Sequence, residues 1–305
     1  MGEKEVRVAL IAPADQIPMR VDLFVAQNAP QFKRSVSRDK RTRFLINKIE
    51  VKKSKNVVPH DHVEAFWWVA EETEPTGQIV PLNIIWQDDS VLVLNKQQGV
   101  VVHPGNGNPR GTLLNGLIYR YGPSFFGTGE SQRNGIVHRL DKETSGVMVV
   151  AKDSRSQQNL AHQFKARKTE KHYIALVKGT PLLSKGVVDA PIARDKVHRR
   201  RFTVSAEGRA SFSEYQVLRR FNGFSLLRLN LVTGRTHQLR VHLKHIGLPI
   251  IGDALYCRDS KNPLMLHALS LSFTHPVSGE RLTFKAPLPS RFKDYITSQS
   301  HIGRD

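Results

Sequence analysis

The sequence contains a single cysteine, Cys257, so no disulfide can form within the chain and a zinc site with several cysteine ligands is excluded. It has no apolar run approaching the roughly 18–20 residues that a membrane-spanning helix needs. The first residues lack the long apolar core of a secretory signal, and we therefore expect a cytoplasmic protein with no membrane association. Neither a P-loop nor a dinucleotide-binding fingerprint occurs, and we expect no cofactor.

Acidic residues are scarce relative to basic ones. The 305 residues include 27 Asp and Glu against 46 Lys and Arg, which gives a formal net charge of +19. Such an excess predicts a polyanionic partner, either nucleic acid or an anionic membrane surface. Because no segment could span a bilayer, nucleic acid is the simpler interpretation. A chain of this length has room for one large or two modest domains.

Two segments hold much of the basic charge. Between positions 33 and 55, ten cations are opposed only by Asp39 and Glu50. This imbalance favours binding to the RNA backbone, which supplies affinity and salt dependence rather than sequence choice. The second segment, residues 191–204, is either a strand that tracks RNA or a solvated loop, and the charge of the whole chain favours RNA. The residues expected to contact RNA are Lys33, Arg34, Arg38, Lys40, Arg41, Arg43, Arg194, Arg199 and Arg200.

Composition divides the chain into four parts. We predict an N-terminal extension at residues 1–19, a small module at 20–70, an acidic linker at 71–81 and a larger domain at 82–305. In the larger domain, short apolar strands alternate with a few helices without a regular βαβ rhythm. This pattern predicts an α+β fold with a mixed, mainly antiparallel sheet flanked by helices. Two of these helices are predicted to begin at the N-caps Thr112 and Ser156.

The most informative stretch is residues 135–151. Its first twelve residues contain Gly, Thr, Ser and charges of both signs, as loops do, and the last five are the apolar run of a buried strand. The loop places Asp141 between Arg139 and Lys142, and nearby positive charge favours an ionised carboxylate. That environment suits a nucleophile better than a general acid. On these residues alone, one half of a structural salt bridge is the commoner role for such an acid.

The wider pattern around Asp141 favours the catalytic role over the structural salt bridge. His138-Arg139-Leu140-Asp141, followed by Thr144-Ser145-Gly146, resembles the catalytic motif of the RluA-type RNA pseudouridine synthases. The resemblance implies the pseudouridine synthase fold for residues 82–305 and Asp141 as the nucleophile. It further implies that Arg139 fills the space left by a flipped base and that His138 lies in the base pocket.

Three later residues extend the resemblance. Tyr173, within Lys171-x-Tyr-x-Ala, resembles the family's active-site tyrosine, whose ring packs against the target base. Leu266 is expected to line the other side of the base pocket. Arg235 begins the run Arg-Thr-His-Gln-Leu-Arg after a strand-to-helix turn, and the resemblance implies that it pairs with Asp141.

The small module also resembles a known domain. Residues 20–22, 33–35 and 61–63 are similar to the pattern of the S4-like RNA-binding domain that precedes the catalytic domain in many members of the family. The module departs from that pattern at Asn47, at Lys52-Lys53 and at His60-Asp61, where turn glycines are usual. These departures affect the expected geometry of the turns more than the basic charge of the module.

His237, His242 and His245 suggest a metal site at first sight. His237 and His245 are eight residues apart in a predicted helix, which is roughly 12 Å along its axis and too far for one shared ion. No acidic or cysteine partner is close in sequence. We therefore expect no metal.

The resemblance implies that the protein converts uridine to pseudouridine in structured RNA after flipping the base out of its stack. Ribosomal RNA is the preferred substrate, with tRNA as an alternative, and a monomer is the default state. Attack by Asp141 on the sugar or on the base, and a glycal route, all stay open. Two competing functions are a non-catalytic RNA-binding or ribosome assembly protein on the same fold, and a metal-dependent hydrolase that uses Asp and His.

Overall fold

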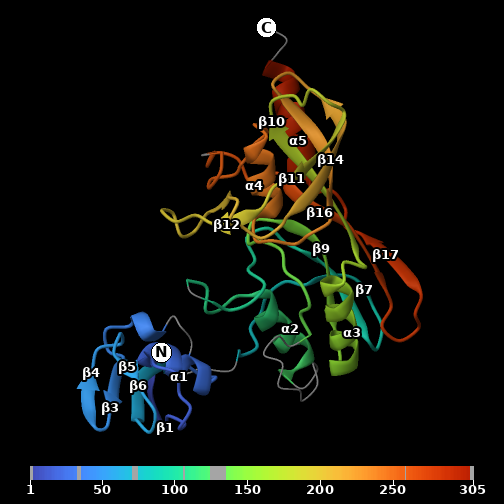
Figure 1. The fold of residues 1–305 in the computed structure, drawn as a ribbon. Coiled ribbons are helices and arrows are strands. Elements are labelled where there is room, and N and C mark those ends of the chain that lie inside the picture. The colour runs from blue at the N-terminus through green and yellow to red at the C-terminus, as the bar shows by residue number, and fades with distance from the viewer. Residues whose placement is uncertain are drawn as a thin grey trace. The chain divides into compact units, whose positions relative to one another are not determined.

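The computed structural model describes residues 3–32, 36–70, 75–105, 107–123, 135–257 and 259–302. The chain divides into two compact units, Met1–Glu74 and Pro75–Asp305 (Figure 1). The division falls inside the segment predicted as a linker. None of the described helices is both long and apolar enough to cross a membrane.

The first unit is built on a four-stranded antiparallel sheet in the order β1-β6-β3-β4. These strands are β1 (Glu3–Ile11), β6 (His62–Ala70), β3 (Arg43–Ile46) and β4 (Ile49–Val51). Beside them are helix α1 (Val21–Asn28), the short turn η1 (Val36–Arg38) and the small ladder of β2 (Met19–Arg20) with β5 (Asn56–Val57). The core is aromatic, because the Phe32 ring meets those of Phe44 and Trp67 edge-on at 5.8 and 5.0 Å.

The predicted N-terminal extension is wrong. Strand β1 pairs with β6 along its whole length, from Glu3 opposite Ala70 to Ile11 opposite His62. Alternate residues of β1, Val6, Val8 and Leu10, pack against the core of this unit. This period of two is what a half-buried strand requires.

The second unit contains a nine-stranded sheet whose main path runs β11-β14-β15-β10-β16-β9-β8-β7. Neighbours are antiparallel except for β16 and β9, which are parallel. The strands are β7 (Asn83–Gln87), β8 (Val91–Lys96), β9 (Ser145–Ala151), β10 (Glu170–Lys178), β11 (Lys185–Asp189), β14 (Phe212–Arg220), β15 (Phe224–Leu231) and β16 (Leu266–Thr274), with β17 (Arg281–Lys285) paired to β16. The predicted α+β fold with a mixed, mainly antiparallel sheet is confirmed.

Helices cover both faces of the β8–β9 region of this sheet. The second unit has four described helices, α2 (Leu113–Tyr121), α3 (Ser154–Lys165), α4 (Gln238–His245) and α5 (Ser290–Ile302), of which α2 and α3 lie on opposite faces of the β8–β9 region. Along β8, Leu92 and Leu94 face the core that contains α2, whereas Val91 and Val93 face the cluster that contains α3. Burial on both faces explains why these strands are continuous apolar runs.

Side chains cap the two helices whose starts were predicted. Thr112 caps α2 in a reciprocal capping box with Asn115, as expected. Helix α3 is capped by Asp153, whose carboxylate accepts hydrogen bonds from the amide and the hydroxyl of Ser156. The predicted cap Ser156 is therefore wrong by three residues, since an aspartate just upstream takes that position.

Strand β16 changes partners at the point where the Asp141 loop enters the sheet. On one edge it pairs first with β9, at His267 and Ala268, and then with β17 from Ser270 onward. Gly146 lies opposite Ala268 with a φ of 126°, and a Cβ there would come within 2.2 Å of the Ala268 carbonyl oxygen. Only glycine allows the two backbones to approach so closely.

Gly146→Ala is expected to destabilise the protein by roughly 2–4 kcal/mol, because it combines a backbone clash with an unfavourable φ. The measurement is the urea midpoint of unfolding. Gly105→Ala is the matched control, since no atom lies within 4 Å of its added Cβ and its φ is not positive. Equal midpoints for the two variants would contradict this account of the junction.

Candidate active site

A cavity in the second unit brings together residues that are far apart in the sequence. Its wall is formed by the loop before β9, by one residue each of β10 and β15, by the start of β16 and by the turn that leads into α4. The lining residues used below are Arg139, Asp141, Tyr173, Arg235, His237, Arg240 and Leu266. All seven residues come from the parts of the sequence that carry the resemblance, namely residues 138–146, 171–175 and 235–240 and Leu266.

Helix α4 is held at its start by one glutamine. The Gln238 side-chain oxygen accepts hydrogen bonds from the Thr233 hydroxyl, at 2.7 Å, and from the Arg235 amide, at 3.0 Å. Its side-chain nitrogen donates to the Phe212 carbonyl and to the Ser213 hydroxyl on β14, at 2.9 Å each. The buried amide thus fixes the turn and the direction of α4 relative to the sheet.

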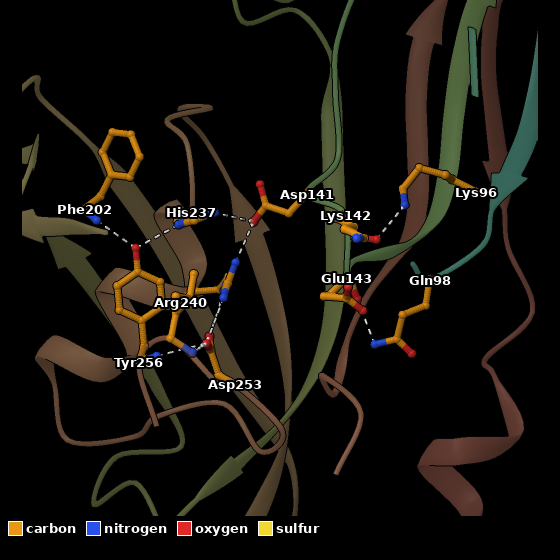
Figure 2. A network of polar contacts seen from close by, with 11 residues as sticks. Lys96, Gln98, Asp141, Lys142, Glu143, Phe202, His237, Arg240, Asp253 and Tyr256 are labelled. Atoms are coloured by element: carbon orange, nitrogen blue, oxygen red, sulfur yellow. Dashed lines mark hydrogen bonds and ion pairs between the residues drawn. The ribbon is translucent and has the colours of Figure 1, made fainter. Parts of the chain in front are cut away.

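The carboxylate of Asp141 reaches a buried guanidinium across this cavity. Its Oδ2 lies 3.4 Å from Nη1 of Arg240 and 3.9 Å from Nε2 of His237 (Figure 2). The Asp141 side chain is one-fifth exposed, whereas that of Arg240 is 7% exposed. The acid is therefore accessible from the cavity while its partner is held in the protein.

Arg240 is fixed from behind by a second carboxylate. Its Nε and Nη2 each donate to Asp253 at 2.8 Å, and Asp253 also accepts from the backbone amides of Leu255 and Tyr256 at 3.0 Å. Burial opposes the charge of Arg240, but the hydrogen bonds and charge of Asp253, aided by Asp141, raise its pKa above the usual value. This bidentate pairing leaves Nη1 available for Asp141.

The predicted pairing of Arg235 with Asp141 is wrong. Arg235 does line the cavity, but its Nε donates to the Ala210 carbonyl at 3.3 Å, and the described residues include no ion pair between it and Asp141. The guanidinium at Asp141 belongs to Arg240, five residues further on. Arg240 lies in the first turn of α4, where Asp253 can hold it, whereas Arg235 precedes the helix.

Tyr173 and Leu266 both line the cavity, where the resemblance placed them. They lie on adjacent antiparallel strands, since Tyr173 is opposite Ala268 and Leu266 is opposite Ala175. Burial, and to a lesser extent the charge of Asp141, raise the pKa of Tyr173, so its hydroxyl keeps its proton at neutral pH. The cavity therefore has one aromatic and one aliphatic wall beside the carboxylate.

Arg139 and His138 separate into different environments. Arg139 is exposed and lines the cavity. His138 does not line it, because its Nε2 accepts a hydrogen bond from the Val149 amide at 3.1 Å and its ring stacks on Phe164 at 4.4 Å. Burial lowers the pKa of His138 to about 3, so the ring is neutral and structural. The prediction of a base-pocket role for His138 is wrong.

Lys96 is a site-supporting residue that sequence reasoning missed. It is the buried last residue of β8, and its Nζ donates to the carbonyls of Gln97 and Val100 at 2.8 and 2.7 Å. It also donates to the Lys142 carbonyl at 3.2 Å (Figure 2). Burial lowers the pKa of Lys96 to about 8, against the opposing charges of Asp141 and Glu143. The amine anchors the backbone of the residue after Asp141. A lysine that ends an apolar strand is the signal that could have revealed it.

The three histidines near α4 do not converge. His237 faces Asp141, and His242 is buried against the Ser213 hydroxyl and the Ala190 carbonyl, at 3.0 Å each. His245 is exposed at the end of the helix. The described residues contain no group of His, Cys, Asp or Glu side chains arranged to hold a metal ion.

The second basic segment forms an exposed hairpin of β12 (Ile192–Arg194) and β13 (Phe202–Val204). Arg194, Arg199 and Arg200 are exposed on it. The hairpin contacts the site, because the Phe202 amide donates to the Tyr256 hydroxyl at 2.9 Å. Figure 2 shows Phe202, Tyr256 and His237 as one chain of contacts.

The first basic segment is only partly free for RNA. Arg41 pairs with Glu3 and Asp39, and Arg43 lies 3.8 Å from Glu5. Lys40 is exposed. The predicted contacts Lys33 and Arg34, and the side chain of Arg38, lie outside the described residues.

Comparison with known proteins agrees with this geometry. Residues 90–245 match the family model described as RNA pseudouridylate synthase. The chain is 39% identical to the ribosomal large subunit pseudouridine synthase D of Nitrosomonas europaea, over 94% of this chain and 86% of that protein. It is 40% identical to an uncharacterized RNA pseudouridine synthase of Aquifex aeolicus, over 90% and 92%.

A solved structure shows the same fold. The human RNA pseudouridylate synthase domain containing 1 superposes with a TM-score of 0.57 and 26% identity, covering 73% of this chain and 96% of that one. The family model alone matches just over half of the chain. The chain therefore belongs to the RNA pseudouridylate synthase family.

Proposed function

We propose that this protein isomerises uridine to pseudouridine in ribosomal RNA, with Asp141 as the nucleophile. The observation that carries the proposal is one accessible carboxylate, held by the buried Arg240, in a cavity with Tyr173 and Leu266 as its walls. A flat base that enters this cavity would meet the apolar surfaces of Tyr173 and Leu266. Stacking and burial there would offset the few kcal/mol that flipping a base out of its stack costs.

The reaction can be balanced with the protein's own groups. The N1–C1′ bond of the target nucleotide breaks, the uracil turns within the cavity, and a C5–C1′ bond forms. The C5 proton is lost and N1 gains a proton, so the conversion is an isomerisation. Asp141 adds to either the sugar carbon or the base and is regenerated at the end. Arg139, exposed at the cavity, would occupy the space vacated in the RNA stack.

Ribosomal RNA is the proposed substrate because several relatives carry the name ribosomal large subunit pseudouridine synthase D, among them those of Nitrosomonas europaea and Haemophilus influenzae. We propose further that the first unit is an S4-like RNA-binding domain, which its sequence pattern and its exposed basic residues support. Action as a monomer in the cytoplasm stays a prediction.

Asp141→Asn is expected to lower turnover by about 10⁴-fold or more, because the isosteric amide cannot act as a nucleophile. Release of tritium from RNA that contains uridine labelled at C5 measures the reaction directly. Glu143→Gln, an exposed carboxylate in the same loop, is the matched control and should keep full activity. Tritium release by the Asp141 variant would remove Asp141 from the chemistry. If the wild-type protein releases no tritium from any RNA tested, the result would favour the non-catalytic RNA-binding alternative.

Replacing Arg199 and Arg200 together with alanine is expected to weaken RNA binding and to reduce the slope of log affinity against log salt. The reduction should be about 0.7–0.9 for each phosphate that the hairpin no longer neutralises. Lys285→Ala with Lys293→Ala removes the same charge from exposed positions on β17 and α5 and serves as the control. If both double variants have the wild-type slope, the hairpin does not contact phosphates.

A further inference from the structure

The two oxygens of Asp141 have different surroundings. Arg240 Nη1, at 3.4 Å, and His237 Nε2, at 3.9 Å, both approach Oδ2. Within the described part of the chain, no hydrogen bond or ion pair reaches Oδ1. Figure 2 shows both dashed lines meeting at the same oxygen while the other oxygen points away from them.

We propose that His237 is a second positioning residue for the nucleophile. Its Nε2–H, together with Arg240, holds Oδ2, and Oδ1 is the oxygen that attacks the substrate. This inference rests on the proposed role of Asp141. A closure of about 1 Å would bring Nε2 within hydrogen-bond distance of Oδ2, and catalytic hydrogen bonds are often long before substrate binds.

The neighbouring tyrosine determines which nitrogen of His237 carries the proton. The Tyr256 hydroxyl accepts a hydrogen bond from the Phe202 amide at 2.9 Å and lies 2.8 Å from Nδ1 of His237. The proton of the Tyr256 hydroxyl can therefore be donated to Nδ1. Burial raises the pKa of Tyr256 to about 12, so the hydroxyl keeps this proton. Burial also lowers the pKa of His237, against the charge of Asp141, so the ring is neutral. A neutral ring that accepts at Nδ1 carries its proton on Nε2, which faces Asp141.

The backbone at His237 supports a functional role. His237 adopts a left-handed conformation with φ of 58° and ψ of 17°, which is uncommon for a residue other than glycine. It is also the N-cap of α4, yet its side chain makes no capping hydrogen bond. The ring is instead turned toward Tyr256 and Asp141. A strained residue that gives up the usual capping contact is typical of a functional site.

The arrangement has a chemical consequence. When Oδ1 bonds to carbon, the carboxylate loses its charge and Oδ2 becomes an ester carbonyl oxygen. When that C–O bond breaks, the electron pair returns to Oδ1, and the restored negative charge is shared with Oδ2. Two donors already aimed at Oδ2 stabilise this developing charge without reorganisation. Loss of the His237 donor should therefore act on kcat more than on KM.

The two ring nitrogens allow a structural role to be separated from a positioning role. His237→Asn places an amide where Nδ1 was, so Tyr256 keeps its partner but Asp141 loses its donor. Asparagine also tolerates the left-handed backbone better than most residues. His237→Gln places an amide nitrogen near the position of Nε2 and restores that donor.

His237→Asn is expected to lower kcat for tritium release by roughly 10²-fold, with little change in KM or thermal midpoint. His237→Gln should recover most of that loss. His162→Asn, at an exposed position on α3, is the control and should match the wild type. Adding Tyr256→Phe to His237→Asn should not lower kcat further, because Tyr256 acts through His237.

Two results would overturn the inference. One is a wild-type kcat for His237→Asn, and the other is an equal kcat loss in both His237 variants together with lowered thermal midpoints. The Asp141→Asn experiment keeps this test distinct from the proposed function. If the Asp141 variant is inactive and the His237→Asn variant is unaffected, only this inference is contradicted. If the Asp141 variant is active, the proposed function itself is contradicted.

Discussion

The arrangement of the site depends on one buried guanidinium shared between two carboxylates. Placing Arg240 inside the protein is unfavourable unless its charge and its N–H groups are matched, and a cation in the first turn of a helix also opposes the helix dipole. Asp253 offsets both costs with two hydrogen bonds of 2.8 Å. Once the back of the guanidinium is bound in this way, the direction of Nη1 is fixed. Asp141 is then presented to the cavity by a group that cannot turn away.

The sheet supplies the rest of the geometry. Strand β16 contributes Leu266 to the cavity, pairs with the strand that carries Tyr173, and meets Gly146 at the end of the Asp141 loop. Lys96 holds the same loop through the Lys142 carbonyl. The loop is therefore tied at two points that follow Asp141, by groups that do not line the cavity. Such supporting contacts allow a loop to hold a reactive side chain close to the geometry that catalysis requires.

Sequence reasoning found the elements of the site better than their pairings. The motif placed Asp141, Tyr173 and Leu266 in one cavity because each position is marked by its local pattern. It could not choose between Arg235 and Arg240, since both lie in the same short run and the choice depends on Asp253, which is distant in sequence. His138 was misassigned for a similar reason, because adjacent residues of one loop can face opposite environments. Strand β1 was missed although its apolar residues alternate, because four of its first five residues are charged.

The internal ion pairs of the first unit have a consequence for what that unit can recognise. Arg41 and Arg43 are held by carboxylates and also lie over the rings of Trp68 and Phe66, at 5.4 and 5.2 Å. Between residues 36 and 55, the other exposed basic side chains that the structure describes are all lysines, namely Lys40, Lys48, Lys52, Lys53 and Lys55. An ammonium group is a mobile point charge without the planar fork that reads the edge of a guanine or grips a phosphate in one orientation. RNA contacts made through these five lysines would therefore tolerate variation in geometry and would read little of the base sequence.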